Sequence, residues 1–292
     1  MVVGALTWGM LSLVACGTSA APPAPEPPVA PAPEPEPEPV VAPEPEPEPE
    51  PEPTLADLQR PPPEGWVDLA EHIDGVRLDI RYHTADNFTG APLPGYGVPG
   101  AWMLREAGDA LQRVQADLKG KGLGLLVYDA YRPLRGTKGM VAWAERTDQV
   151  HLLDDGYVAR RSQHNKGTTI DLSVVDLSTG EELDMGTPWD TLSEASHTTK
   201  ATGKALENRL LLREVMHAHG FKNYWKEWWH YSLKTEAKLP YRDVPYSCWE
   251  ADEGAWAPPP GWNVPGFVMP PAHVPEPCDG ATPPAGAAPA VP

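Results

Sequence analysis

Residues 21–53 consist almost entirely of Pro, Glu, Ala and Val, with Pro-Glu repeated in blocks. Such a stretch has too little apolar surface to form a core, and its prolines hold φ near the polyproline II value. At about 3.1 Å per residue it extends on the order of 100 Å as a semi-rigid spacer. A folded domain must therefore come from the residues that follow. We place it at residues 54–241, which are enough for one domain with a substantial core.

The charge of the chain is concentrated in this spacer. The spacer contains nine Glu and no basic residue, which is half of the formal net charge of -18. The remaining negative charge on the folded part is mild. A nucleic-acid partner is not expected, because such a partner requires a basic face.

The pattern of residues 1–15 is typical of a targeting segment. Residues 1–15 are largely apolar but too short to span a bilayer stably, which predicts a signal peptide. The segment ends in Leu13-Val14-Ala15, and Cys16 follows. This sequence resembles the bacterial lipobox, in which the Cys becomes the lipidated first residue of the mature protein. We therefore expect an exported lipoprotein, anchored to a membrane through Cys16 and facing the periplasm or cell wall, with residues 16–53 as anchor and linker. The alternative is an ordinary signal peptide in which Cys16 is incidental.

Residues 242–292 form an extension rich in Pro, Gly and Trp without clear periodicity. Cys248 and Cys278 are the cysteines that remain if Cys16 is lipidated. In an exported protein two such cysteines favour a disulfide, and closing a loop of about 30 residues stabilises by roughly 3 to 4 kcal/mol in the chain-entropy model. Zinc ligation by these cysteines is the alternative, but the close Cys-x-x-Cys spacing of such sites is absent. We expect the extension to lie over the domain as a strap.

Two stretches have the spacing of amphipathic helices. Between Leu104 and Leu118 the apolar residues step by three and four, and Gly120 follows as a stop signal. A second helix is predicted over residues 199–219, with Gly220 placed to cap it.

Two apolar stretches predict strands. Residues 123–128 form a short strand that delivers residues 129–132 at its end. Residues 169–175 alternate, with Ile170 on one face and Asp171 on the other, so Asp171 should point away from the core side of its strand. Helices flanking short strands of hairpin type favour an α+β class over a parallel α/β one. We expect a single domain with a small antiparallel sheet flanked by helices.

Three segments far apart in the chain carry residue types that a hydrolytic metal site needs. His164 and Asp171 lie seven residues apart, His230 follows Glu227 by three, and Arg132 stands just before a proline. Two imidazoles and one carboxylate form a three-ligand set that leaves a coordination position free for water, which distinguishes a catalytic zinc from a structural one. Glu227 is then a spare carboxylate able to take the proton of that water.

Each segment alone has a plainer interpretation. A His with an Asp nearby is common in a chain with nine histidines. The residues around Glu227 could be a strand that packs Trp228 or Trp229 into the core, and Arg132 could make an ordinary ion pair in a turn. The combination of all three segments is much less expected by chance.

The spacing of Glu227 and His230 has a geometric consequence. In a regular strand, residues three apart fall on opposite faces. If both serve one metal centre, Glu227 must lie in a loop or bulge, and the regular strand should begin near Trp228.

The three segments resemble motifs of the VanX-like zinc D-Ala-D-Ala dipeptidases, a branch of the M15 peptidases. This family shares its metal-site fold with D,D-carboxypeptidases and the Hedgehog signalling domain. Its pattern Ser-x-His-x-x-Gly-x-x-x-Asp begins at Ser162 and ends at Asp171, its Glu-Trp-Trp-His-Tyr occupies residues 227–231, and its Tyr-Arg-Pro occupies residues 131–133. Two further stretches resemble the dipeptidase branch specifically, at residues 81–88 and 184–190. The likeness covers residues from about Trp66 to about Tyr241.

The resemblance implies a zinc metallopeptidase that hydrolyses D-Ala-D-Ala to two D-Ala with one Zn²⁺ per chain. The expected zinc ligands are His164, Asp171 and His230. Glu227 is the expected base and Arg132 the expected stabiliser of the oxyanion. By resemblance alone, Ser162 helps to hold the carboxylate of the substrate and Asp190 receives its free ammonium.

Two other functions remain open at this point. One is a D,D-carboxypeptidase that uses the same chemistry on longer peptidoglycan stem peptides. The other is a non-catalytic, zinc-stabilised cell-wall-binding domain. The binding function is disfavoured because Glu227 and Arg132 are both present, and a domain that only binds needs neither.

Overall fold

A central sheet of five strands organises the computed structural model, which describes residues 58–248. The strand order is β2-β4-β5-β7-β6, and each neighbouring pair is antiparallel except β2 and β4. The strands are β2 (Arg77–Leu78), β4 (Leu123–Asp129), β5 (Thr169–Asp176), β6 (Phe221–Asn223) and β7 (His230–Leu233). A separate antiparallel pair joins β1 (Trp66–Asp68) to β3 (Trp102–Leu104). The expected small, largely antiparallel sheet is confirmed, with the two-residue β2 as its parallel exception.

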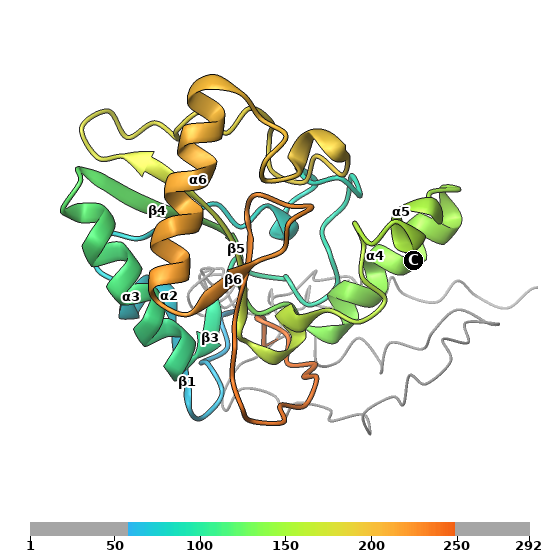
Figure 1. Ribbon diagram of the computed structural model, residues 1–292. Coiled ribbons are helices and arrows are strands. Elements are labelled where there is room, and N and C mark those ends of the chain that lie inside the picture. The colour runs from blue at the N-terminus through green and yellow to red at the C-terminus, as the bar shows by residue number, and fades with distance from the viewer. Residues whose placement is uncertain (1–57, 249–292) are drawn as a thin grey trace, which may run out of the picture. The chain divides into compact units, whose positions relative to one another are not determined.

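Two long helices cover one side of this sheet, α3 (Arg105–Lys119) and α6 (Gly203–Ala218), which lie side by side in Figure 1. The others are α2 (Leu69–His72), α4 (Leu134–Arg146) and α5 (His151–Asp154). Three short 3-10 helices complete the set: η1 (Arg81–His83), η2 (Gln163–Lys166) and η3 (Glu194–Ser196). The helices α4 and α5 lie together, away from α3 and α6 (Figure 1). This arrangement is the predicted α+β domain.

The predicted helices form where the apolar spacing placed them. The buried side of α3 includes Ala107, Leu111, Val114 and Leu118. The helix α6 begins at Gly203 rather than at residue 199, and Gly220 follows it with a φ of 89°. That left-handed conformation costs little only for glycine, so Gly220 ends the helix as expected.

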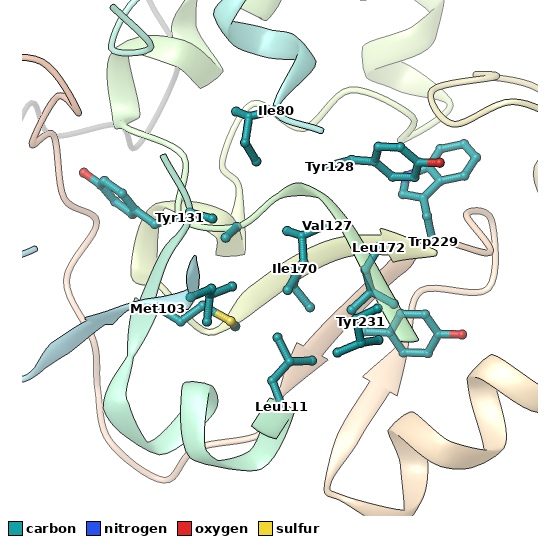
Figure 2. Packing of buried hydrophobic residues seen from close by; sticks show 14 of the residues in the cluster. Ile80, Met103, Leu111, Val127, Tyr128, Tyr131, Ile170, Leu172, Trp229 and Tyr231 are labelled. Carbon is teal, nitrogen blue, oxygen red and sulfur yellow. The ribbon is translucent and has the colours of Figure 1, made fainter. Parts of the chain in front are cut away.

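The core lies between the sheet and the helices. Figure 2 shows side chains from α3, β4, β5 and β7 meeting there, among them Leu111, Val127, Ile170 and Tyr231. On β5 the alternation of faces holds, but both faces are buried. Asp171 therefore does not point to open solvent, as a half-exposed strand would allow. It faces a partly open cavity that it lines together with other polar side chains.

The chain beyond residue 241 packs onto the domain as far as the structure describes it. Tyr246 is completely buried, and its backbone N–H donates to the carbonyl of Gly95 (2.9 Å). Cys248 is buried and disulfide-bonded. Cys16, Cys278 and the Pro-Glu spacer lie outside the described residues, so the pairing of Cys248 with Cys278 stays a prediction.

Within residues 58–248, no helix has the length and apolar character needed to cross a membrane.

Gly167 closes the turn that carries His164, and it provides a test of local packing. Its φ is 72°, and a Cβ there would lie 2.2 Å from the ring of Trp66. Gly90 has the same φ of 72° but nothing within 4 Å of such a Cβ. Both alanine variants carry the cost of a left-handed conformation, about 1 to 2 kcal/mol. We expect Gly167→Ala to lower the free energy of unfolding by about 1 to 3 kcal/mol more than Gly90→Ala, because it also overpacks the core.

Urea unfolding of both variants beside the wild type measures this difference. Equal losses in the two variants would mean that Trp66 moves aside freely, and that the turn is not held by this contact.

Candidate metal centre

Three side chains converge on one point in the wall of the cavity. The Nε2 atom of His164, the Oδ1 atom of Asp171 and the Nδ1 atom of His230 form a triangle with sides of 3.2, 3.3 and 3.0 Å. His164 and Asp171 are almost completely buried, and His230 is partly exposed. The residues that the sequence analysis selected as ligands are therefore brought together.

The dimensions of this triangle fit a small tetrahedral metal ion. Bonds of about 2.0 to 2.2 Å from a tetrahedral zinc place its ligand atoms roughly 3.3 Å apart. The ring of His164 also has the partner that a ligand needs, because its Nδ1 lies 2.7 Å from the backbone carbonyl of Ala130. That carbonyl can only accept, so Nδ1 carries the proton and Nε2 is left with a lone pair for a metal. The donor set can hold a metal ion without rearrangement.

The sheet supplies two of the three donors. Asp171 on β5 lies opposite His230 on β7, and on its other side it lies opposite Asp129 at the end of β4. The three residues thus form one row across neighbouring strands. His164 comes from η2, whose first turn is capped by the hydroxyl of Ser162 accepting from the N–H of His164 (3.2 Å).

The electrostatic environment of Asp171 and His230 favours the protonation states that bind a cation. Burial alone would raise the pKa of Asp171, but His164 and His230 together bring that pKa below its usual range. Burial lowers the pKa of His230 in spite of the carboxylate beside it. An ionised Asp and a neutral His are the protonation states that metal ligands require.

Glu227 lies in the loop before β7, as the spacing argument required. Its N–H donates to the carbonyl of Tyr224 (2.9 Å), and its own carbonyl accepts from Nδ2 of Asn223 (2.9 Å). The strand begins at His230 itself, two residues later than expected, because residues 224–229 form turns. This places the Oε2 atom of Glu227 3.5 Å from Nδ1 of His230.

The carboxyl group of Glu227 is buried beside other acids. Burial, followed by the charges of Asp171 and Asp190, raises the pKa of Glu227 well above its ordinary value. A carboxyl group with a raised pKa accepts and returns protons more readily than an exposed one. Glu227 therefore has the position and the environment of a general base next to the ligand triangle.

Arg132 is buried and firmly held. Its Nε and Nη2 both donate to Oδ2 of Asp129 (2.9 and 2.7 Å), and Nη2 lies 3.8 Å from Oδ2 of Asp171. The guanidinium also lies 5.2 Å from the ring centre of Tyr82. Burial alone would lower the pKa of Arg132, but the charge of Asp129 keeps that pKa above its ordinary value. The cation is thus fixed beside the ligand triangle.

Asp190 is the third acid of the cavity. It has a φ of 58°, which is uncommon for a residue other than glycine, and its Oδ2 accepts from the hydroxyl of Tyr82 (2.8 Å). Burial and the nearby charge of Asp171 raise its pKa well above the ordinary value. A partly buried carboxylate without an ion-pair partner among the described residues is costly, so this position favours a ligand that brings a positive charge.

All the candidate residues line one cavity of about 210 Å³. Its wall includes Arg132, Ser162, His164, Asp171, Asp190, Glu227 and His230, with apolar contributions from Phe88, Met140, Leu192 and Trp229. The volume is below the roughly 300 to 1,000 Å³ of pockets for drug-sized ligands, which indicates a small substrate.

Two residues that support these groups were not predicted from the sequence. Asp129 holds Arg132, and Tyr82 holds Asp190. Tyr82 stands inside a stretch that carried the family resemblance and Asp129 stands two residues before one, but no spacing rule connected them to their partners. The sequence marked Asp129 only as a polar residue at the end of a buried strand. It marked Tyr82 only as a Tyr within an otherwise polar turn.

Comparison with known proteins agrees with this geometry. The family model Peptidase_M15, described as D-Ala-D-Ala dipeptidase, matches residues 63–252. A D-alanyl-D-alanine dipeptidase of Enterococcus faecalis is 38% identical over 195 residues, which cover 62% of this chain and 95% of that protein. Another from Enterococcus faecium is 37% identical, covering 59% of this chain and 93% of that protein. One from Escherichia coli is 34% identical, covering 62% and 91%.

The match to the family model spans more than half of the chain and includes every residue of the site described above. The chain belongs to the M15 peptidase family, in the group whose model describes D-Ala-D-Ala dipeptidases.

Proposed function

We propose that this protein is a zinc dipeptidase that hydrolyses free D-Ala-D-Ala to two molecules of D-Ala. The observation that carries the proposal is the placement of a ligand triangle, the buried Glu227 and the partly buried Asp190 in one small cavity. The relatives that bear the name D-alanyl-D-alanine dipeptidase support the choice of substrate. The donor set of two imidazoles and one carboxylate supports the choice of metal.

His164, Asp171 and His230 would hold the zinc ion through Nε2, Oδ1 and Nδ1. In such a site zinc lowers the pKa of water and polarises the carbonyl of the scissile peptide. Glu227 takes the proton of the attacking water and returns it to the leaving amine, because its carboxylate lies next to His230 in a buried environment. Arg132 donates to the oxyanion that develops as the peptide carbonyl becomes tetrahedral.

The ammonium and the carboxylate at the two ends of the dipeptide need partners of different chemistry, an acceptor for the first and a donor for the second. Asp190, held by Tyr82, would pair with the free ammonium. The hydroxyl of Ser162 accepts from the N–H of His164, so its own hydrogen is available to donate to the carboxylate of the substrate. The apolar side chains of Phe88, Met140 and Leu192 suit the methyl groups of alanine.

The decisive measurement is the rate of D-Ala release from D-Ala-D-Ala beside N-acetyl-D-Ala-D-Ala. We expect efficient cleavage of the free dipeptide and little or none of the blocked one. Comparable rates on both substrates would support a D,D-carboxypeptidase that acts on peptidoglycan stem peptides. A protein that binds stoichiometric zinc but cleaves neither substrate would support a cell-wall-binding domain.

We propose further that the protein is exported and anchored to a membrane by lipidation of Cys16. The support lies in the apolar run of residues 2–15, the Leu-Val-Ala-Cys sequence that ends it, and the Pro-Glu spacer that follows. The spacer would hold the enzyme away from the membrane, towards the cell wall.

Cell fractionation tests this anchor. We expect the wild-type protein in the membrane fraction, because several acyl chains bind a bilayer stably whereas one does so only marginally. Cys16→Ser should appear in soluble or uncleaved form. Ser19→Ala provides a matched control, because it alters a residue three positions after Cys16 and leaves every cysteine in place. Wild-type protein found free in the cytoplasm would contradict the proposal.

A further inference from the structure

Residues 242–248 run across the two loops that carry Arg132 and His164. The N–H of Arg242 donates to the carbonyl of Asn165 (2.9 Å), and the carbonyl of Arg242 accepts from the N–H of Leu134 (3.0 Å). This segment therefore contacts both loops at residues adjacent to, or two positions from, the site residues. None of residues 242–248 lines the cavity itself.

Tyr246 is the most deeply packed residue of this segment. Its hydroxyl donates to the carbonyl of Tyr131 (2.6 Å) and accepts from the N–H of Trp102 (3.2 Å). Its ring centre lies 4.4 Å from that of Trp102 and 5.4 Å from that of Tyr96. The side chain is thus fixed by both hydrogen bonds and aromatic contacts.

Tyr246 reaches Arg132 by two routes. The first is through the backbone, because Tyr131 immediately precedes Arg132. The second is through Tyr96, whose hydroxyl donates to Oδ1 of Asp129, while Oδ2 of the same carboxylate accepts from Arg132. The hydroxyl of Tyr246 therefore supports the backbone position of Arg132, and its ring supports, through Tyr96, the partner of the guanidinium.

The fit around this ring leaves little freedom. A Cβ at Gly100 would lie 2.1 Å from Cδ1 and 2.5 Å from Cε1 of Tyr246, so only glycine permits the observed position. Gly100 does not have a left-handed φ, so its absence of a side chain serves the packing of Tyr246 rather than the backbone conformation.

We propose that Tyr246 is a positioning residue for Arg132, and that residues 242–248 belong to the catalytic domain and contribute to its activity. The inference rests on the proposed function, since the position of Arg132 matters only if a charge develops on a substrate beside it. A guanidinium that stabilises a transition state must be held within a fraction of an ångström of its working position. Tyr246 keeps it there without touching the substrate.

The first test is Tyr246→Phe, which keeps the ring and removes the hydroxyl. We expect kcat on D-Ala-D-Ala to fall by about tenfold to a hundredfold, the scale of loss for a small misplacement of a catalytic group. KM and zinc content should stay at their wild-type values, because Arg132 acts in the transition state and Tyr246 is not a ligand. Tyr231→Phe is the matched control, because the buried hydroxyl of Tyr231 has no hydrogen-bond partner among the described residues. That variant should keep the wild-type kcat.

A double-mutant cycle separates positioning from general support of the fold. If Tyr246 acts through Arg132, Tyr246→Phe should cost little further activity in an Arg132→Ala background. Gly100→Ala displaces the same ring without altering its hydroxyl, and it should reproduce the loss of kcat even if Tyr246→Phe proves unstable. Multiplicative losses in the cycle, or an unchanged kcat in both single variants, would overturn the inference.

The two proposals fail in distinguishable ways. A wild-type enzyme that does not cleave D-Ala-D-Ala contradicts the proposed function. A wild-type enzyme that cleaves it, together with a fully active Tyr246→Phe, contradicts only the role of Tyr246.

Discussion

Replacing Glu227 by Gln should reduce kcat by about a hundredfold to ten-thousandfold and leave the bound metal in place. The expected loss is the usual contribution of a general base, since Gln has the same shape but cannot take a proton. Metal should remain because the predicted ligand atoms belong to His164, Asp171 and His230, which form a complete triangle without Glu227. Metal analysis of the desalted protein and steady-state kinetics give the two readouts.

The contrasting variant is His164→Ala, which should lose both zinc and activity, because two remaining ligands make a poor site. Glu207→Gln serves as a control for the acid-to-amide change, since Glu207 is exposed on α6 and does not line the cavity. If Glu227→Gln released its metal as readily as His164→Ala, Glu227 would be a ligand and the assigned roles would be wrong.

The second large effect concerns the length of the substrate. A charge-assisted contact between Asp190 and the free ammonium is commonly worth about 1.5 to 3 kcal/mol, or roughly a tenfold to hundredfold preference for the free dipeptide. Asp190→Asn should lose that preference, because the amide offers no charge to the ammonium and no longer penalises a blocked amine. The measurement is the ratio of kcat/KM for D-Ala-D-Ala to that for N-acetyl-D-Ala-D-Ala.

Asp154→Asn is the matched control for this ratio. Asp154 is an exposed acid that pairs with Arg160 on the surface, so its change should leave the ratio at the wild-type value. An Asp190→Asn enzyme that still strongly prefers the free dipeptide would place the ammonium elsewhere in the cavity.

The convergence of His164, Asp171 and His230 was predicted from residue types and from the spacings within each motif. The fold class followed from the apolar periodicity of the two long helices and of β5. The loop position of Glu227 followed from geometry alone, since a strand cannot turn both Glu227 and His230 to one centre. These features are local, and local chemistry is what a single sequence records best.

Other features depend on contacts between distant segments, which spacing does not reveal. The register that places Asp129, Asp171 and His230 in one row arises from strand pairing across the sheet. The burial of both faces of β5 depends on how the surrounding elements close over it. Tyr246 had no periodicity to mark it, because its position is set by Gly100, Trp102 and Tyr131.

The cross-strand pairing of Asp171 with His230 has a consequence for how this chain reaches its native state. A slip of one residue between β5 and β7 would turn one of these side chains to the opposite face of the sheet. A metal ion that requires both donors binds only the correctly paired sheet, and by mass action it lowers the population of slipped forms. The metal would then favour the native pairing of β5 with β7 during folding, before any substrate binds.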